Sequence, residues 1–406
     1  MINLFDTKKS PAKAYRNIAI ILVIILLVPF VPSMLDWGNG TVRTLDLALL
    51  YIMLALGLNT VVGFAGLLDL GYIAFYAIGA YMAGLLASNQ FAVVLQSFVD
   101  NYPTIGNALV WFFGADVTAN GIHLSVWAIV PLAAAMAGLF GAILGAPTLK
   151  LRGDYLAIVT LGFGEIIRIF MNNLSQPVNI TNGAVGISGI DPVSIMGVSF
   201  DGEPGSHSIV KFLGLAIPKV NAYYYLFVFL CIVVVFITLR LQHSRLGRAF
   251  VALREDEIAA KAMGINTRNV KLLAFSLGAS FGGIAGSMYA SFQGFISPES
   301  FSLDESISVL AMVVIGGMGY VPGVILGGVL LASLPEVLRY TVDPIQNALF
   351  GKVFIPAEVA RLLMIGLAMV LTMLIRPAGL WPSPKHEERP DADTDVANQS
   401  TDVVSV

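Results

Sequence analysis

Long apolar runs, separated by short polar stretches, fill most of this chain. Most runs are long enough to cross a hydrocarbon core of about 30 Å, because a helix rises about 1.5 Å per residue. Glycine and proline interrupt the pattern near residues 63–71 and 316–323. The expected spans are residues 17–35, 45–62, 66–87, 124–147, 155–171, 221–239, 272–292, 307–318, 321–338 and 359–375. The pattern predicts an all-α polytopic membrane protein with about eight to ten transmembrane helices, the broken ones either crossing or re-entrant.

Polar stretches divide the chain into three parts. Residues 1–16 are expected to form a basic N-terminus, residues 17–380 the transmembrane domain, and residues 381–406 a disordered tail rich in Pro, Asp, Glu and Ser. Two stretches inside the transmembrane part, 88–123 and 172–220, are expected to be loops. The composition is typical of a membrane protein, since 57% of residues are hydrophobic and 12% are charged, against about 25% charged in soluble domains.

The distribution of Lys and Arg predicts how the chain crosses the membrane. Basic residues gather in residues 1–16, 150–152, 240–271 and 376–389, and they are sparse in the alternate connections. By the positive-inside rule, this bias places both termini and the 240–271 segment in the cytoplasm. The formal net charge of -3 does not favour nucleic acid as a partner.

Residues 245–271 form the one long polar, helix-forming segment between two strongly apolar runs. Apolar Phe250, Leu253 and Ile258 recur at roughly helical spacing, with charged residues on the other faces. Gly264 then supplies a helix stop. An amphipathic helix between two spans suits the docking of a soluble partner, and an ordinary solvated loop is the alternative interpretation.

Several residues inside the apolar runs are candidates for a transport pathway or a gate. Glu165 and Arg168 lie three apart on one helix and are expected to form an ion pair. Asp69 is a candidate helix cap as well as a pathway residue. The irregular backbone at the Gly/Pro breaks must face protein or a wet cavity. The candidate pathway residues are Asp69, Gly71, Glu165, Arg168, Gly316, Gly317 and Gly319.

Two sets of glycines have another expected role. Gly278, Gly282 and Gly286 repeat every four residues, as do Gly319, Gly323 and Gly327. Small residues at this spacing let helices in lipid approach one another closely, so we expect these positions to be packing sites.

Motifs for catalysis, cofactors and metals are missing from the sequence. The phosphate-binding pattern Gly-x-x-x-x-Gly-Lys-Ser/Thr and the Gly-x-Ser-x-Gly elbow do not occur. The single cysteine, Cys231, and four scattered histidines offer no metal-ligand spacing. The sequence therefore predicts a protein that is not an enzyme and that holds no cofactor and no metal.

Four stretches carry a resemblance to a known family. Residues 257–264 (EIAAKAMG) resemble the Glu-Ala-Ala coupling loop of ABC-transporter permeases. Residues 66–81 (GLLDLGYIAFYAIGAY), 151–165 (LRGDYLAIVTLGFGE) and 376–380 (RPAGL) resemble the LivM-type permeases of branched-chain amino acid importers. The sequence departs from the general coupling pattern at Ile258, where that pattern has Glu, and it lacks the downstream Leu-Pro.

The resemblance implies an ABC importer permease fold and a multi-subunit transporter in the bacterial inner membrane. The implied partners are a second homologous permease of the LivH type, two cytoplasmic ATPases and a periplasmic amino-acid-binding protein. The residues expected to couple to an ATPase are Arg254, Asp256, Glu257, Ala259, Ala260 and Gly264. The alternatives are a permease of the same architecture for urea or short amides, an ion-coupled secondary transporter and a structural membrane scaffold.

Overall fold

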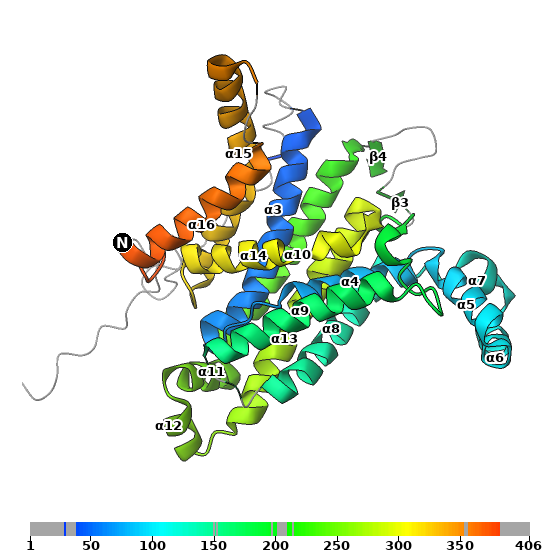
Figure 1. Ribbon diagram of the computed structural model, residues 1–406, viewed down its shortest axis with the longest axis horizontal. Coiled ribbons are helices and arrows are strands. Elements are labelled where there is room, and N and C mark those ends of the chain that lie inside the picture. Colours follow the sequence, from blue (N-terminus) through cyan, green and yellow to red (C-terminus); the bar gives the residue numbers. More distant parts are fainter. Residues whose placement is uncertain are drawn as a thin grey trace, which may run out of the picture.

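The computed structural model describes residues 28–29, 38–148, 151, 153–195, 198–200, 209–212, 215–352 and 356–381. This part of the chain is almost entirely helical (Figure 1). Its α-helices are α3 (Gly38–Asn59), α4 (Ile73–Leu86), α5 (Gln90–Asn101), α6 (Pro103–Phe113), α7 (Ala115–Asn120), α8 (Val126–Thr148), α9 (Asp154–Asn173), α10 (Lys219–Gln242), α11 (Arg245–Glu255), α12 (Glu257–Ala262), α13 (Thr267–Gln293), α14 (Leu303–Gly316), α15 (Val321–Phe350) and α16 (Ala357–Ile375).

Short elements complete the described part. A π-helical turn, η1 (Thr60–Phe64), continues α3, and two 3-10 turns are η2 (Gly183–Val185) and η3 (Pro298–Phe301). The strands form three antiparallel pairs: β1 (Ile187–Ser188) with β6 (Phe295–Ile296), β2 (Ser194–Ile195) with β3 (Val198–Ser199), and β4 (Ile209–Phe212) with β5 (Leu215–Pro218).

The structure confirms the predicted all-helical membrane fold. Among the described residues, five helices are long and apolar enough to cross a bilayer, namely α3 with η1, α8, α10, α13 and α15, and the bent pair α4–α5 makes six if it is one span. Helices α9, α14 and α16 also occupy predicted runs. The predicted run at 17–35 lies almost wholly outside the described residues.

The expected loop at 88–123 is wrong, because three helices, α5 to α7, lie there. Pro103 stands at the first position of α6, where its missing N–H costs no hydrogen bond, and Gly114 and Gly121 stop α6 and α7 in positive-φ conformations. The polar faces of these helices obscured the helical spacing of their apolar positions. Helix α5 turns by 80° from α4, so the pair does not continue in a straight line.

Helix α13 lies at the centre of the bundle and packs against α8, α4 and α3. The glycines predicted to pack do so: a Cβ at Gly278 would overlap the Val61 side chain, and one at Gly286 would overlap the carbonyl oxygen of Tyr76 in α4. Gly323 and Gly327 similarly bring α15 against the backbone of α14. Close backbone approach stabilises the bundle through dispersion in a solvent that provides no hydrophobic force between helices.

Candidate functional site

The predicted amphipathic segment folds as two short helices, α11 and α12, which together we call the elbow. Ser244 caps α11 by accepting a hydrogen bond from the Gly247 backbone N–H at 3.1 Å. Asp256 separates the two helices: its extended backbone ends α11, and its carboxylate accepts from the N–H groups of Ile258 at 2.7 Å and Ala259 at 2.9 Å. One continuous helix was the simpler expectation. The aspartate divides it because its side chain satisfies the first N–H groups of a new helix.

Gly264 is the stop that the sequence predicts. Its φ is +83°, the left-handed region that favours glycine after a helix end. Asn266 then caps α13 by accepting a hydrogen bond from the Asn269 N–H at 3.2 Å. These signals hold the elbow as a compact turn between α10 and α13, at the lower left of Figure 1.

Arg254 connects the elbow to the first broken span. Its guanidinium donates to the carbonyl oxygen of Gly63, in the π-helical turn that ends α3, at 2.7 Å. A π-turn leaves helix carbonyls without their regular partners, and the arginine satisfies one of them. The guanidinium therefore points back toward the membrane domain.

The two Gly/Pro breaks meet at this point. The Gly319 N–H, in the second break, donates to the side-chain oxygen of Asn59 at 2.8 Å, and Asn59 is fully buried at the end of α3. Gly319 has a φ of +81° and packs against the Gly63 carbonyl group. Side chains of α3 and of the elbow thus satisfy backbone groups of two irregular segments that are distant in sequence.

Glu257 forms an ion pair with Lys271 on the first turns of α13, with 2.7 Å between Oε1 and Nζ. The Lys271 side chain is 5% exposed, so it depends on this carboxylate. A buried ammonium that loses its partner destabilises a protein strongly. The pair joins α12 to α13, and Glu257 is largely engaged within the chain.

The exposed tip of the elbow carries two large apolar side chains. Ile258 is 70% exposed and Met263 is 84% exposed. Ala259 and Gly264 are also exposed, whereas Ala260 is buried. Sequence reasoning did not place Ile258 and Met263 in the coupling set; two large apolar side chains within the most polar loop of the chain were the available signal.

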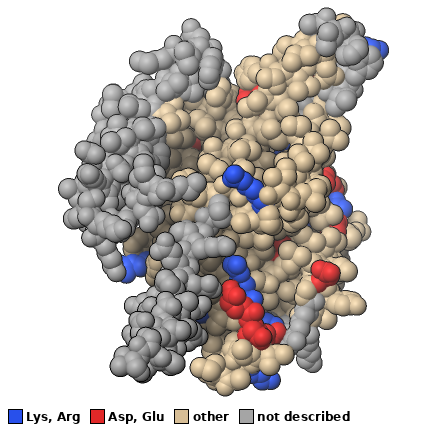
Figure 2. Space-filling model, turned by 90° about the vertical axis from the view of Figure 1, so that its left-hand side faces the viewer, with Lys and Arg blue, Asp and Glu red and all other residues tan. Residues whose placement is uncertain are grey.

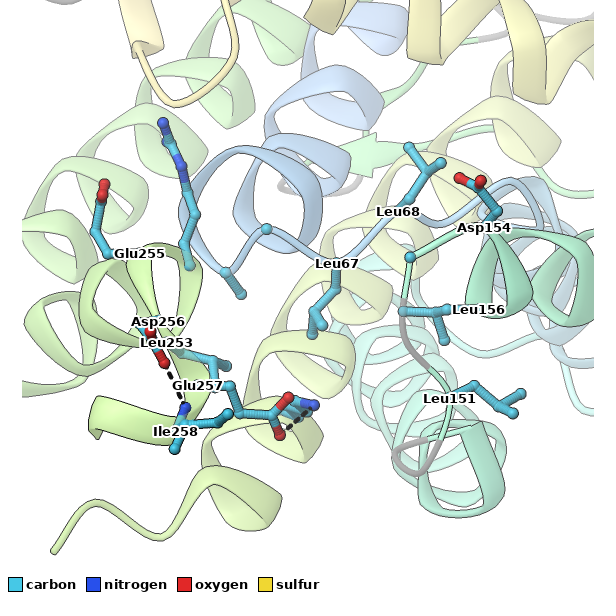
Figure 3. Close-up of a pocket in the computed structure, with 15 residues that line it drawn as sticks. Leu67, Leu68, Leu151, Asp154, Leu156, Leu253, Glu255, Asp256, Glu257 and Ile258 are labelled. Atoms are coloured by element: carbon cyan, nitrogen blue, oxygen red, sulfur yellow. Dashed lines mark hydrogen bonds and ion pairs between the residues drawn. The ribbon is translucent and has the colours of Figure 1, made fainter. Parts of the chain in front are cut away.

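A cavity of about 380 Å³ opens between the elbow and the membrane domain (Figure 3). Its walls are the first break at residues 65–68, the elbow at residues 253–258, Lys271 of α13, and Leu151, Gly153, Asp154 and Leu156 at the entry to α9. In Figure 3 the elbow residues lie at the left, Leu67 lies at the centre, and Leu151 and Leu156 lie at the right. Movement of the elbow therefore changes the space beneath the first break.

The first break continues to Asp69 and Gly71. Asp69 is 2% exposed, and its carboxylate accepts from the Gly71 N–H at 2.9 Å. The helix that follows begins only at Ile73, so the expectation that Asp69 caps it is wrong. Asp69 instead closes a tight turn two residues long. A Cβ at Gly71 would overlap the carbonyl oxygen of Thr160, which brings α9 directly against this turn.

The expected ion pair between Glu165 and Arg168 is confirmed, at 3.0 Å. The structure adds Glu299 of η3, whose carboxylate lies 3.1 Å from the same guanidinium. This contact joins α9 to the segment that leads into α14. The remaining pathway candidates, Gly316 and Gly317, pack against Gly323 and the carbonyl oxygen of Trp381.

Charge is scarce on the face of the molecule in Figure 2. Acidic and basic side chains gather toward its lower end, which is the end where the elbow lies in Figure 1. Within the described residues, no group of three or more His, Cys, Asp or Glu side chains is placed to hold a metal ion. The arrangement is suited to mechanical coupling between a soluble face and broken membrane helices.

Comparison with known proteins identifies the family. Residues 40–374 match the family described as the branched-chain amino acid transport system permease component. The chain is 40% identical over 379 residues to the high-affinity branched-chain amino acid transport system permease protein LivM of Escherichia coli, covering 92% of this chain and 76% of that protein. It is 26% identical over 340 residues to a probable LivM permease of Methanocaldococcus jannaschii, covering 82% of this chain and 90% of that protein.

A second group of relatives carries a different name. The chain is 25% identical over 339 residues to the permease protein LivH of Escherichia coli, covering 83% of this chain and 93% of that protein. No solved structure matches. These matches confirm the resemblance predicted from the sequence and establish a multi-pass, non-catalytic permease component. The chain therefore belongs to the branched-chain amino acid transport system permease family.

Proposed function

We propose that this chain forms half of the pore of an ABC importer for leucine, isoleucine and valine, with its elbow held by a separate ATPase. A second permease of the LivH type forms the other half, and a periplasmic binding protein delivers the amino acid. The names of the relatives support this assignment of substrate and partner. The charge bias supports an inner-membrane orientation with both termini and the elbow in the cytoplasm.

One observation carries the proposal: the elbow exposes two large apolar side chains at its tip and is bonded to the first break and to α13. Ile258 and Met263 offer the surface that a soluble partner would cover. Arg254 and Glu257 bond inward, to Gly63 and Lys271. We propose that the partner contacts the tip, including Ala259 and Gly264, and that Arg254, Asp256, Glu257 and Ala260 transmit its movement by fixing the elbow.

Coupling then follows from differential binding. ATP closes the ATPase pair, the bound elbows move with it, and the membrane breaks shift between two arrangements. The candidate pathway residues Asp69, Gly71, Glu165, Arg168, Gly316, Gly317 and Gly319 lie in or beside these breaks, or on the helix packed against them.

The double substitution of Ile258→Asp and Met263→Asp tests the docking. Placing two charges in an apolar contact costs desolvation, so co-purification of the ATPase and ATP-dependent leucine uptake should fall at least about tenfold. Val251→Asp is the matched control, because Val251 is 45% exposed on the same elbow but away from the tip. Full recovery of the ATPase with the double variant would contradict the docking.

Competition for uptake tests the substrate. Vesicles containing the whole complex should lose labelled leucine uptake when unlabelled valine or isoleucine is added, and keep it when urea or acetamide is added. The reverse pattern would favour the urea or short-amide alternative. Uptake that follows an ion gradient without the ATPase would favour a secondary transporter.

A further inference from the structure

Three polar side chains from distant helices meet inside the apolar bundle. The Tyr51 hydroxyl on α3 donates to Oε2 of Glu305 on α14 at 2.7 Å. Arg361, near the start of α16, places a guanidinium nitrogen 3.8 Å from Oε1 of the same carboxylate. We call Tyr51, Glu305 and Arg361 the charge cluster.

The contact between Arg361 and Glu305 is loose. At 3.8 Å it is longer than a hydrogen bond, and the buried Nε of Arg361 has no hydrogen-bond partner among the described residues. A guanidinium has five N–H donors, and leaving a buried one unused is costly. A pair that served only to tie α16 to α14 would be expected to close into direct hydrogen bonds.

The charge cluster lies at mid-depth in the membrane. The C-terminal end of α14, at Gly316 and Gly317, packs against the residues that follow α16. The second break, which follows α14, lies against Arg254 of the elbow. Tyr51, which donates to Glu305, lies eleven residues from Gly40 and thirteen from Phe64, the ends of the span formed by α3 and η1. The charge cluster therefore lies near the middle of a membrane span, where ionisable groups are expensive and mark functional sites.

The charge cluster is open on one face. The Arg361 side chain is 24% exposed and that of Glu305 is 22% exposed. Helices α9, α14 and α16 lie on the near side of the molecule in Figure 1, and α14 contacts both of the others. A face that carries both signs of charge at membrane depth is unsuited to lipid.

We propose that the charge cluster is a recognition site for the zwitterionic head of the transported amino acid, completed by the second permease across this face. Arg361 binds the α-carboxylate through the part of its guanidinium that reaches the open face, and Glu305 binds the α-ammonium. Tyr51 fixes the carboxylate of Glu305 from the side away from the substrate. This inference rests on the proposed function, since it assumes that the transported solute is an amino acid.

Three aromatic rings from α4, α13 and η3 form a packed group. The rings of Tyr76, Tyr289 and Phe301 pack against one another with centroids 5.4 to 6.3 Å apart. Phe301 of η3 precedes Glu305 by four residues, so this packing fixes the entry to α14. Rigid aromatic packing of this kind pre-organises polar groups for a ligand.

The experiment uses the whole complex in vesicles and measures leucine uptake together with ATP hydrolysis, at saturating binding protein. Glu305→Gln and Arg361→Gln keep the size of each side chain roughly and remove its charge. Each should lower leucine transported per ATP by about tenfold, the factor expected for a lost charge-assisted hydrogen bond, while ATP hydrolysis changes less than about twofold. Tyr51→Phe should lower the same ratio by a smaller factor.

Two controls separate recognition from structure. Asp304→Asn removes an exposed charge one residue away and should leave the ratio unchanged. Exchanging the charges, Glu305→Arg with Arg361→Glu, should not restore the ratio, because the substrate head would then bind in reverse. Restoration by the exchange, an equal fall of uptake and ATP hydrolysis, or unchanged uptake in the single variants would overturn the site. If the unaltered complex takes up no leucine, the proposed function itself is wrong and this inference fails with it.

Discussion

At the scale of single residues, the Asn59 side chain joins two distant parts of the chain. It is fully buried, and its one side-chain oxygen holds the Gly319 N–H of a segment 260 residues away. An unsatisfied backbone group at this depth is costly because no water can replace the lost partner. One amide thus determines how two broken spans lie together.

Replacing Asn59 tests this function. Asn59→Ala leaves the Gly319 N–H without a partner, so the free energy of unfolding should fall by about 1 to 3 kcal/mol. Thermal unfolding of the purified protein in detergent measures the change. Asn173→Ala is the control, since Asn173 is exposed and bonds only within its own helix at Ile169. Equal stability of the two variants would show that the breaks do not depend on Asn59.

The contacts of His123, which lies outside the membrane segments, predict that the stability of the protein depends on pH. Its Nδ1 lies 2.6 Å from the Asp191 carboxylate and its Nε2 lies 2.6 Å from the Asn120 carbonyl oxygen. Both nitrogens face acceptors, an arrangement that only the protonated ring satisfies. The hydrogen bond to Asp191 accordingly raises the pKa of His123 above its usual 6.5.

Because the pKa of His123 is raised in the folded protein, the contact stabilises the fold at low pH. The contact contributes its full stabilisation below about pH 6.5, the unfolded value, and loses it as pH rises through the raised folded pKa. The loss should be small, about 1 kcal/mol or less, because both side chains are more than one-third exposed. Unfolding temperatures between about pH 5.5 and 8.5 measure it. Asp191→Asn should flatten the profile, and an unchanged profile would speak against the assignment.

At the scale of elements, glycine positions decide how closely the helices pack. The four-residue spacing on α13 predicts this from sequence alone, since small residues at that spacing have one common use in lipid. The elbow is less predictable. In the sequence Asp256 is one of several consecutive charged residues, and only the fold shows that it caps a second helix. The helices at 88–123 were missed because their polar positions resemble a loop when the pattern is read for membrane spans.

Gly286→Val tests the packing of α13. The new side chain would overlap the Tyr76 carbonyl oxygen, so α13 and α4 must separate, and the expected loss of stability is about 1 to 3 kcal/mol or more. Gly366→Val on α16 is a matched control, because nothing lies within 4 Å of a Cβ there. Thermal unfolding compares the two. A Gly286 variant as stable as the control would show that this approach is dispensable.

Exchanging the charges of Glu257 and Lys271 tests how the elbow is held. Glu257→Gln leaves the buried ammonium without its carboxylate and should reduce both stability and ATP-dependent uptake. The double variant Glu257→Lys with Lys271→Glu should recover much of both. Recovery of stability without recovery of uptake would mean that Glu257 also contacts the ATPase directly.

At the scale of the whole molecule, the sequence predicts most of the membrane helices but few of the contacts between them. Apolar runs, broken spans and the polar elbow follow from hydropathy and helix signals. The contacts of Arg254 with Gly63 and of Arg361 with Glu305 join residues 191 and 56 positions apart. No local pattern encodes such distances, and a single sequence offers no pairing signal. The tip residues Ile258 and Met263 similarly need the fold to show that they are exposed.

The bond between Arg254 and Gly63 makes the separation of the elbow and the first break a useful distance to follow during transport. Because that bond ties the elbow to the first break, the separation between them changes only if the bond breaks or the two travel together. The chain has a single cysteine, Cys231, which is buried. Once it is replaced, a spectroscopic label pair at Glu255 and Leu68, on opposite walls of the cavity, would report which of those two motions accompanies nucleotide binding.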